Sequence, residues 1–260
     1  MLEVRPYLQR IGYEGRTAPD PAVLAALHRA HLLAVPFENL DIHLGRPIVL
    51  SVERFFEKIV RDRRGGFCYE LNGLFAALLG ELGFQVALLS ARVVRPDGTV
   101  TPPFDHLTLS VGCPGRSERW LCDVGFGEGF LEPLRLVAGA ERTQHSGLYR
   151  LAADGGDYVL LRRADPEVPL TAAYRFTTEP HELAAFAEMC EHQQTSPESH
   201  FTQQRVCSLA TPEGRVTLTG TRLIVTRRGQ RSEVPIQDDA AYRAALSDWF
   251  GITVRGAWAA

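Results

Sequence analysis

The sequence predicts an α+β fold in which a helical first third is followed by a β-rich middle and a mixed final part. Apolar residues recur at helical spacing up to about residue 83, whereas strict alternation of apolar and polar residues begins beyond it, most clearly at 106–111. Near the end, a hairpin pattern over 215–227 precedes a last helical stripe at 242–250. A chain of 260 residues can bury a sizeable core, and we expect its three parts to pack closely.

The first third begins with two predicted helices. A short apolar stripe covers residues 7–11, and Asp20 can cap a second helix that has Pro21 at its first position. His28 and His31 lie on one face of that helix at a spacing compatible with a metal ion, but no third ligand accompanies them. We therefore expect the two histidines to lie on a solvated helix edge.

A further helical pattern, over residues 71–82, follows a pair of glycines and a cysteine. Its apolar residues recur at i, i+3, i+4 and i+7, and Gly83 follows at the position of a helix C-cap. Gly65 and Gly66 have no Cβ to block the close approach of a ligand. Cys68 therefore lies in or just before the first turn of a buried helix, where the partial positive charge favours a thiolate and lowers the pKa of the thiol. On position alone, Cys68 is equally well explained as a small core side chain.

Two charged residues of this region lie among apolar neighbours. Glu38 belongs to the loop 35–42, and Arg64 follows a helical stretch over 53–60 and directly precedes the pair of glycines. A buried charge requires a partner of opposite sign. We therefore predict that Glu38 and Arg64 form an ion pair that ties this loop to the approach of the Cys68 helix.

The middle of the chain is predicted to form short strands that make a β-rich layer or a small barrel. These strands are expected at 84–94, 106–111, 120–124, 147–151, 158–163 and 174–177. Beyond them the sequence predicts a helix over 180–191, a hairpin of 215–219 with 222–227, and a final helix over 242–250.

Two of the middle strands carry a histidine and a carboxylate. If they form an antiparallel hairpin around the loop 113–118, His106 and Asp123 lie on the same side of the sheet, whereas alternation points Asp105 to the opposite face. A carboxylate at one ring nitrogen would orient the imidazole, and the other nitrogen could then take the thiol proton of Cys68. Amides at the start of the cysteine helix could form an oxyanion hole. Taken alone, the pattern is better explained as an ordinary polar strand face with a satisfied histidine.

Composition argues against several classes of protein. The net charge of −3 and the pI near 6.3 argue against a nucleic-acid partner, which requires a basic surface. No apolar run approaches the ~20 residues that span a bilayer, so no membrane partner is expected, and the first residues lack the form of a signal peptide. Five cysteines without CxxC spacing favour a reduced, cytoplasmic protein with no structural zinc.

Four motifs follow one another along the chain: Pro36-Phe-Glu-Asn39, Arg64-Gly-Gly-Phe-Cys68-Tyr-Glu-Leu-Asn72, His106-Leu-Thr-Leu and Asp123-Val-Gly-Phe-Gly127. Together with the segments 7–13, 195–201 and 250–252, they resemble the signatures of the arylamine N-acetyltransferase family. The resemblance is collinear across nearly the whole chain. Tyr69, where many members carry Phe, is a mild departure that leaves the motif cysteine intact.

The resemblance implies an architecture for the three parts of the chain. It implies an N-terminal helical bundle that carries the nucleophile (1–83), a central antiparallel β-barrel that carries the histidine and the aspartate (84–185), and a C-terminal α/β lid (186–260). These parts are expected to surround a catalytic triad of the cysteine-protease kind.

The matched positions also imply site residues. The implied triad is Cys68, His106 and Asp123. The loop of Gly125, Phe126 and Gly127 is similar to the one that approaches the CoA pyrophosphate in the family. The residues implied to contact the acceptor are Phe37 and Phe126, and no metal is implied.

The implied activity is the transfer of an acetyl group from acetyl-CoA to arylamines, arylhydrazines or related small-molecule amines, as in xenobiotic metabolism. The implied route is ping-pong through an acetyl-cysteine, in a monomer or weak homodimer. Three alternatives stay open. The first is an amide synthase of the same fold that closes macrolactams from carrier-bound polyketide chains. The others are a cysteine hydrolase with the same triad and a non-catalytic module that binds CoA or a drug.

Overall fold

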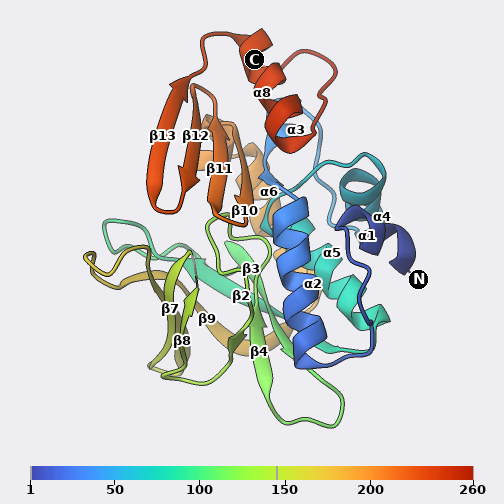
Figure 1. The fold of residues 1–260 in the computed structure, drawn as a ribbon, viewed down its shortest axis with the longest axis vertical. Helices are drawn as coiled ribbons and strands as arrows, with labels where there is room; N and C mark the ends of the chain where they lie inside the picture. The colour runs from blue at the N-terminus through green and yellow to red at the C-terminus, as the bar shows by residue number, and fades with distance from the viewer. Residues whose placement is uncertain (1, 145, 260) are drawn as a thin grey trace.

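The computed structural model describes residues 2–144 and 146–259, which form two sheets flanked by helices. In Figure 1 the larger sheet lies in the lower half, the smaller sheet lies above it, and the N-terminal helices lie along one side. All strand pairs within the two sheets are antiparallel. Across the residues just given, none of the helices combines the length and the apolar character needed to cross a membrane.

The second N-terminal helix begins, and the cysteine helix ends, where the sequence predicts, whereas the predicted loop 35–42 contains the start of a short helix. The side chain of Asp20 accepts hydrogen bonds from the N–H groups of Ala22 and Val23, with Pro21 at the first helical position. Gly83 follows the cysteine helix with φ of 87°, a conformation that strongly favours glycine. The helices are α1 (Val4–Arg10), α2 (Pro21–Ala34), α3 (Leu40–His43), α4 (Val52–Phe56), a π-helical turn (Glu57–Arg61) and α5 (Cys68–Glu81).

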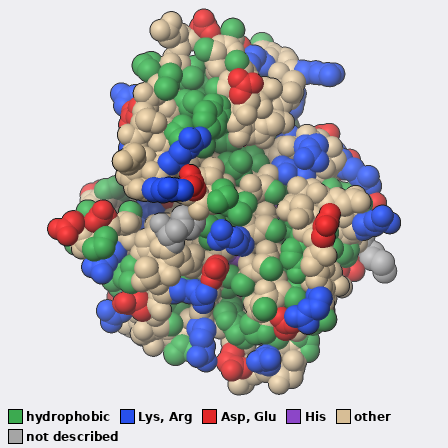
Figure 2. Space-filling view, viewed as in Figure 1, with side chains coloured by type: hydrophobic (Ala, Val, Ile, Leu, Met, Phe, Trp, Pro, Cys, Tyr) green, Lys and Arg blue, Asp and Glu red, His purple; other side chains and the backbone are tan. Residues whose placement is uncertain are grey.

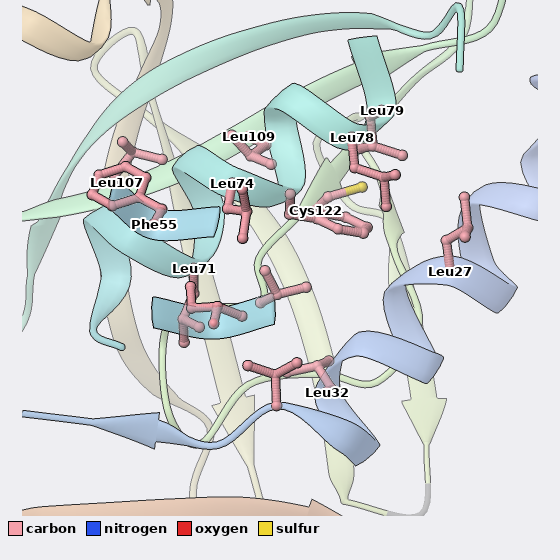
Figure 3. Packing of buried hydrophobic residues seen from close by; sticks show 14 of the residues in the cluster. Leu27, Leu32, Phe55, Leu71, Leu74, Leu78, Leu79, Leu107, Leu109 and Cys122 are labelled. Atoms are coloured by element: carbon pink, nitrogen blue, oxygen red, sulfur yellow. The ribbon is translucent and has the colours of Figure 1, made fainter. Parts of the chain in front are cut away.

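Helix α5 is the centre of the largest apolar core. Leu71, Leu74, Leu78 and Leu79 are fully buried, and they pack between leucines of α2, Phe55 of α4 and residues of the larger sheet (Figure 3). The predicted apolar stripe is thus confirmed. Because neighbours surround this helix, the position of its first turn is fixed by the whole N-terminal core.

The larger sheet closes on itself as a nearly complete barrel. Its strands run in the order β5-β4-β3-β2-β9-β8-β7-β6, so the two ends of the sheet are strands that follow one another in the chain. The side chain of Gln144 bridges the gap between them by accepting hydrogen bonds from the N–H groups of Leu131 and Glu132. The strands are β2 (Gln85–Val93), β3 (His106–Gly112), β4 (Arg119–Cys122), β5 (Leu134–Arg135), β6 (Glu141–Gln144), β7 (Gly147–Asp154), β8 (Asp157–Arg163) and β9 (Thr171–His181).

The helix predicted over 180–191 is wrong in its first half. Strand β9 continues to His181, and Pro180 lies opposite Leu89 of β2. The strand on the other side, β8, pairs with β9 only as far as Phe176, so a proline at position 180 removes no hydrogen bond from that side. Helical structure begins later, with a 3-10 turn (Leu183–Phe186) and then α6 (Ala187–Thr195).

The smaller sheet takes its first strand from the N-terminal part of the chain. Its order is β1-β10-β11-β12-β13, and β1 pairs Phe37 with Ser208 and Glu38 with Cys207. The predicted hairpin is confirmed as β11 with β12, and the final helix as α8. The bounds are β1 (Phe37–Glu38), α7 (His200–Gln203), β10 (Val206–Thr211), β11 (Gly214–Thr219), β12 (Arg222–Arg227), β13 (Gln230–Pro235) and α8 (Asp239–Phe250).

Candidate functional site

A pocket of about 450 Å³ lies where the start of α5, the barrel and the smaller sheet meet. Cys68 and His106 line it, as do Phe37 and the loop Gly125–Phe126–Gly127. Asp123 is fully buried behind His106 and does not line the pocket. The structure therefore brings together all the residues that the sequence motifs single out.

Cys68 is the first residue of α5, and two glycines allow segments of the chain to pack closely at this end of the helix. A Cβ on Gly125 would lie 2.7 Å from the Cα of Cys68, and a Cβ on Gly65 would lie 1.9 Å from the carbonyl oxygen of Pro36. Any larger side chain at either position would push these segments apart. Cys68 as a whole is 4% exposed, so it contacts the pocket but almost no bulk solvent.

His106 and Asp123 form the contact that the predicted hairpin would allow. Strands β3 and β4 pair in the register Leu109 opposite Cys122, so odd-numbered residues oppose even-numbered ones as predicted. The Nε2 atom of His106 lies 2.7 Å from Oδ2 of Asp123. Burial by itself would raise the pKa of Asp123, but His106 and further hydrogen bonds stabilise the carboxylate and hold its pKa below the ordinary value.

Asn72 is a site residue that the motif contained but to which sequence reasoning assigned no role. Its Nδ2 donates to Oδ1 of Asp123 at 2.9 Å and to the carbonyl oxygen of Leu107 at 2.7 Å, and its Oδ1 accepts the N–H of Val124 at 2.9 Å. Asn72 follows Cys68 by four residues, so both side chains lie on one face of α5. One helix thus positions the thiol and holds the carboxylate of Asp123.

The expectation of solvated histidines on α2 is wrong. His28 and His31 are both fully buried, because they continue the apolar stripe that Leu24 and Leu27 begin. His28 donates from Nδ1 to the carbonyl oxygen of Leu131, and its Nε2 accepts the backbone N–H of Asp123 at 3.0 Å. No group of three or more His, Cys, Asp or Glu side chains within residues 2–144 and 146–259 could hold a metal ion.

His28 should make the fold sensitive to acid. Burial lowers its pKa to about 4, against an ordinary value of 6.5, so between these values the unfolded chain binds a proton that the folded chain does not. Stability is therefore lost as the pH falls from about 6.5 towards 4, by about 3 kcal/mol from this residue. We expect His28→Asn to show a shallower fall of melting temperature over this range than the natural protein. The exposed His192→Asn serves as control, and equal slopes in all three proteins would contradict the assignment.

Asp105 does not point away from the site, as alternation along the strand suggested. It lies one residue before β3 begins, where the alternation of a strand does not apply, and it lines the pocket together with Cys68 and His106. Its carboxylate accepts a hydrogen bond from the side chain of Gln193 in α6. The pocket wall therefore carries a carboxylate that acts on the thiol, in addition to the carboxylate of Asp123 behind His106.

The low thiol pKa expected from the helix end is not what the structure indicates. Burial raises the pKa of the Cys68 thiol well above its ordinary value, and the carboxylates of Asp105 and Asp123 act in the same direction, against a hydrogen bond from the N–H of Leu107. Burial destabilises the thiolate by more than the partial positive charge at the first turn of α5 stabilises it. A nearby proton acceptor is therefore needed to form the nucleophile.

The predicted pair of Glu38 and Arg64 is confirmed and belongs to a larger buried network. The Nη2 atom of Arg64 lies 2.8 Å from Glu38 and 3.1 Å from Asp41. Lys58, the only lysine of the sequence, lies 2.9 Å from both Asp41 and Glu70. Glu70 also accepts the backbone N–H of Phe67 and so caps α5 beside the nucleophile. The network joins the segment of β1 and α3 to the start of the cysteine helix.

Comparison with known proteins gives consistent matches over nearly the whole chain. Residues 20–259 match a family model described as N-acetyltransferase. An arylamine N-acetyltransferase of Mycolicibacterium smegmatis is 41% identical, over 96% of this chain and 92% of that protein. An arylamine N-acetyltransferase of Escherichia coli K12 is 35% identical, over 95% of this chain and 88% of that protein.

Solved structures of the same kind superpose closely on this fold. The arylamine N-acetyltransferase from Salmonella typhimurium matches with a TM-score of 0.91 at 31% identity, over 98% of this chain and 93% of that one. The Mycobacterium marinum arylamine N-acetyltransferase in complex with CoA matches with a TM-score of 0.89 at 36% identity, over 96% of this chain and 93% of that one.

Proposed function

The chain belongs to the arylamine N-acetyltransferase family of acyltransferases, and we propose that it moves an acetyl group from acetyl-CoA to small arylamines or arylhydrazines through an acetyl-cysteine. The observation that carries the proposal is the placement of Cys68 and His106 in one pocket, with Asp123 buried behind the imidazole. The CoA complex of the Mycobacterium marinum relative supports acetyl-CoA as the donor.

In the first half of the proposed reaction, the thiol of Cys68 attacks the thioester carbonyl. Because burial holds the thiol protonated, its proton passes to His106 as the carbon–sulfur bond forms. Asp123 accepts from Nε2 of His106, so it fixes the ring orientation and stabilises the imidazolium. The tetrahedral intermediate then expels CoA as its thiol, which takes the proton from His106, and the acetyl group remains on sulfur.

In the second half, the amine attacks the acetyl-cysteine and His106 accepts the proton that the amine loses. The tetrahedral intermediate then breaks its carbon–sulfur bond, which releases the amide, and the sulfur of Cys68 takes the proton back from His106. Phe126 is proposed to shape the acceptor space, because its ring lies 5.2 Å from that of His106 and 5.0 Å from that of Tyr174. Phe37 lines the same pocket on the side of the smaller sheet. Because the acetyl-cysteine would be largely enclosed, water would have little access to the thioester, and a bound amine would react with it in preference to water.

Brief exposure of the protein to acetyl-CoA without an amine tests the proposal most directly. We expect intact-protein mass spectrometry to show a gain of one acetyl group, and peptide mapping to place it on Cys68. Addition of an arylamine should remove the acetyl group and yield the amide. Release of CoA without an acetyl-enzyme and without any amine would indicate a hydrolase. Binding of CoA with no acylation would indicate a non-catalytic module, and either result would overturn the proposal.

A further inference from the structure

Asp105 reaches the pocket because the backbone turns sharply just before it. Phe104 has φ of 66°, in the left-handed region that a bulky side chain rarely adopts. Its N–H donates to Oγ of Ser90 at 2.7 Å, and its ring packs edge-to-face with those of His181 and Phe186. Strained backbone that is held by its surroundings concentrates at functional sites. Here the strained residue directs the next side chain, that of Asp105, to the pocket wall.

A hydroxyl group of the cysteine helix holds the same segment. Oη of Tyr69 lies 2.9 Å from the carbonyl oxygen of Phe104 and 3.2 Å from that of Asp105, and it donates to both. Tyr69 is the position at which the cysteine motif departs from the many family members that carry Phe, and a phenylalanine has no hydroxyl for this contact. The departure therefore ties the backbone of Asp105 to the residue that follows the nucleophile.

The carboxylate of Asp105 is bonded through only one of its oxygens. Oδ1 accepts from Nε2 of Gln193, and Oε1 of Gln193 accepts the hydroxyl of Ser199 at 2.6 Å, so the direction in which this amide faces is fixed. Within residues 2–144 and 146–259, Oδ2 of Asp105 accepts no hydrogen bond, and no Lys, Arg or His nitrogen lies within 4.0 Å of the carboxylate. Oδ2 can therefore accept a hydrogen bond from a molecule in the pocket.

The other charges near the pocket are placed differently. Arg95, Glu128 and Glu198 also line it, but all three side chains are exposed, whereas Asp105 is half-buried. On the face shown in Figure 2, acidic and basic side chains are interspersed, without a broad area of one charge that could select substrates. In the part of the chain that the structure describes, Asp105 is thus the carboxylate best placed to act on a group that approaches the thiol.

We propose that Oδ2 of Asp105 accepts a hydrogen bond from the amine of the acceptor and stabilises the positive charge that forms on its nitrogen. The inference rests on the proposed function and concerns its second half. As the nitrogen lone pair forms the bond to the acetyl carbon, the carbonyl π electrons move to oxygen and the nitrogen becomes positive. One of its two protons passes to His106, and the other stays on nitrogen, bonded to Asp105, and is retained in the amide.

Asp105 itself gains no proton in this sequence. The carbon–sulfur bond then breaks, and the sulfur of Cys68 takes the proton from His106. Because one N–H is consumed and a second one binds Asp105, the pocket favours acceptors with two protons on the attacking nitrogen, which are primary arylamines and hydrazines. The same carboxylate opposes the first half of the reaction, since a negative charge beside the thiol disfavours the thiolate.

Asp105→Asn should therefore affect the two halves of the reaction in opposite directions. Asparagine keeps the shape of the side chain and an oxygen for Gln193 but removes the charge. In single-turnover experiments, acetylation of Cys68 by 4-nitrophenyl acetate should be as fast as in the natural protein or faster. Transfer from the acetyl-enzyme to aniline or phenylhydrazine should slow on the order of 10-fold or more, the loss expected when a hydrogen bond to a charged group is removed.

Two further variants sharpen the experiment. Asp248→Asn removes the same charge from an exposed position on α8 that does not line the pocket, and it should change neither half. Tyr69→Phe should slow transfer in part and leave acetylation intact, because it frees the segment that carries Asp105. If Tyr69 acts through Asp105, the double variant should transfer no more slowly than Asp105→Asn alone.

A binding measurement does not depend on acetyl transfer. Aniline should protect Cys68 from iodoacetamide, and Asp105→Asn should weaken this protection several-fold. Equal losses in both halves of the reaction, or unchanged transfer to the amine, would overturn the inference. If acetyl-CoA failed to acetylate the natural protein, the proposed function would fall, and the protection by aniline would still decide whether Asp105 binds the amine.

Discussion

Replacement of Cys68 by alanine or serine is expected to abolish acetyl transfer from acetyl-CoA to a simple aniline or hydrazide, by at least about 10⁴-fold. The reason is that the proposed acetyl-enzyme cannot form without the thiol. Serine differs from cysteine by one atom in a site that is only 4% exposed, so the fold should persist and circular dichroism should be unchanged. Rates would be measured from amide formation and from the release of CoA.

The other cysteines supply matched controls for this experiment. Cys113, Cys122, Cys190 and Cys207 are buried and free, like Cys68, but the lining of the pocket includes none of the four. We expect single alanine replacements of these residues to keep acetyl transfer even where they lower stability. An acetyl group trapped on any of the four, with Cys68 unmodified, would refute the assignment of the nucleophile.

Arg64→Gln should destabilise the protein by about 3–5 kcal/mol, because it leaves Glu38 buried without its main cationic partner. Glu38 is fully buried and the Arg64 side chain is 8% exposed, so water cannot replace the lost interaction. For a chain of this size the loss corresponds to a melting temperature lower by on the order of 10 °C. Thermal unfolding followed by circular dichroism or scanning calorimetry would measure it.

Arg63→Gln is the matched control, since it removes the same charge from the neighbouring residue. The side chain of Arg63 is exposed and takes part in no ion pair among the residues that the structure describes, so we expect a change within about 0.5 kcal/mol. Small and equal effects of the two substitutions would mean that the buried network does not stabilise the fold.

Features with a local signal in the sequence were predicted well. The apolar period of α5 located the core helix, and alternation along β3 and β4 placed His106 and Asp123 on one face. The pairing of Glu38 with Arg64 followed from the rule that buried charges need partners. In each case the relevant residues lie in one element, in neighbouring elements or within an identifiable apolar stretch.

Features that depend on distant contacts were not predicted. The partners of His28 are Leu131 and Asp123, about a hundred residues away, and the sequence around His28 gives no indication of these contacts. Its burial, by contrast, could have been predicted from its position in the apolar stripe of α2. The pairing of β1 with β10 joins residues 37–38 to the last third of the chain.

The thiol of Cys68 shows the same limit in its electrostatics. Its pKa follows from how completely the barrel and α6 enclose it, whereas sequence reasoning considered only the helix on which it lies.

The place of Lys58 has a consequence for chemical modification of the protein. Lysine amines are the usual sites of unwanted acylation by thioesters and by active-ester reagents. Here the only lysine side chain is 11% exposed, and its amine is held as a cation by Asp41 and Glu70. The remaining 27 basic residues of the 28 Lys and Arg are arginines, which such reagents do not acylate. A protein that handles activated acetyl groups thus presents them with no reactive lysine on its own surface.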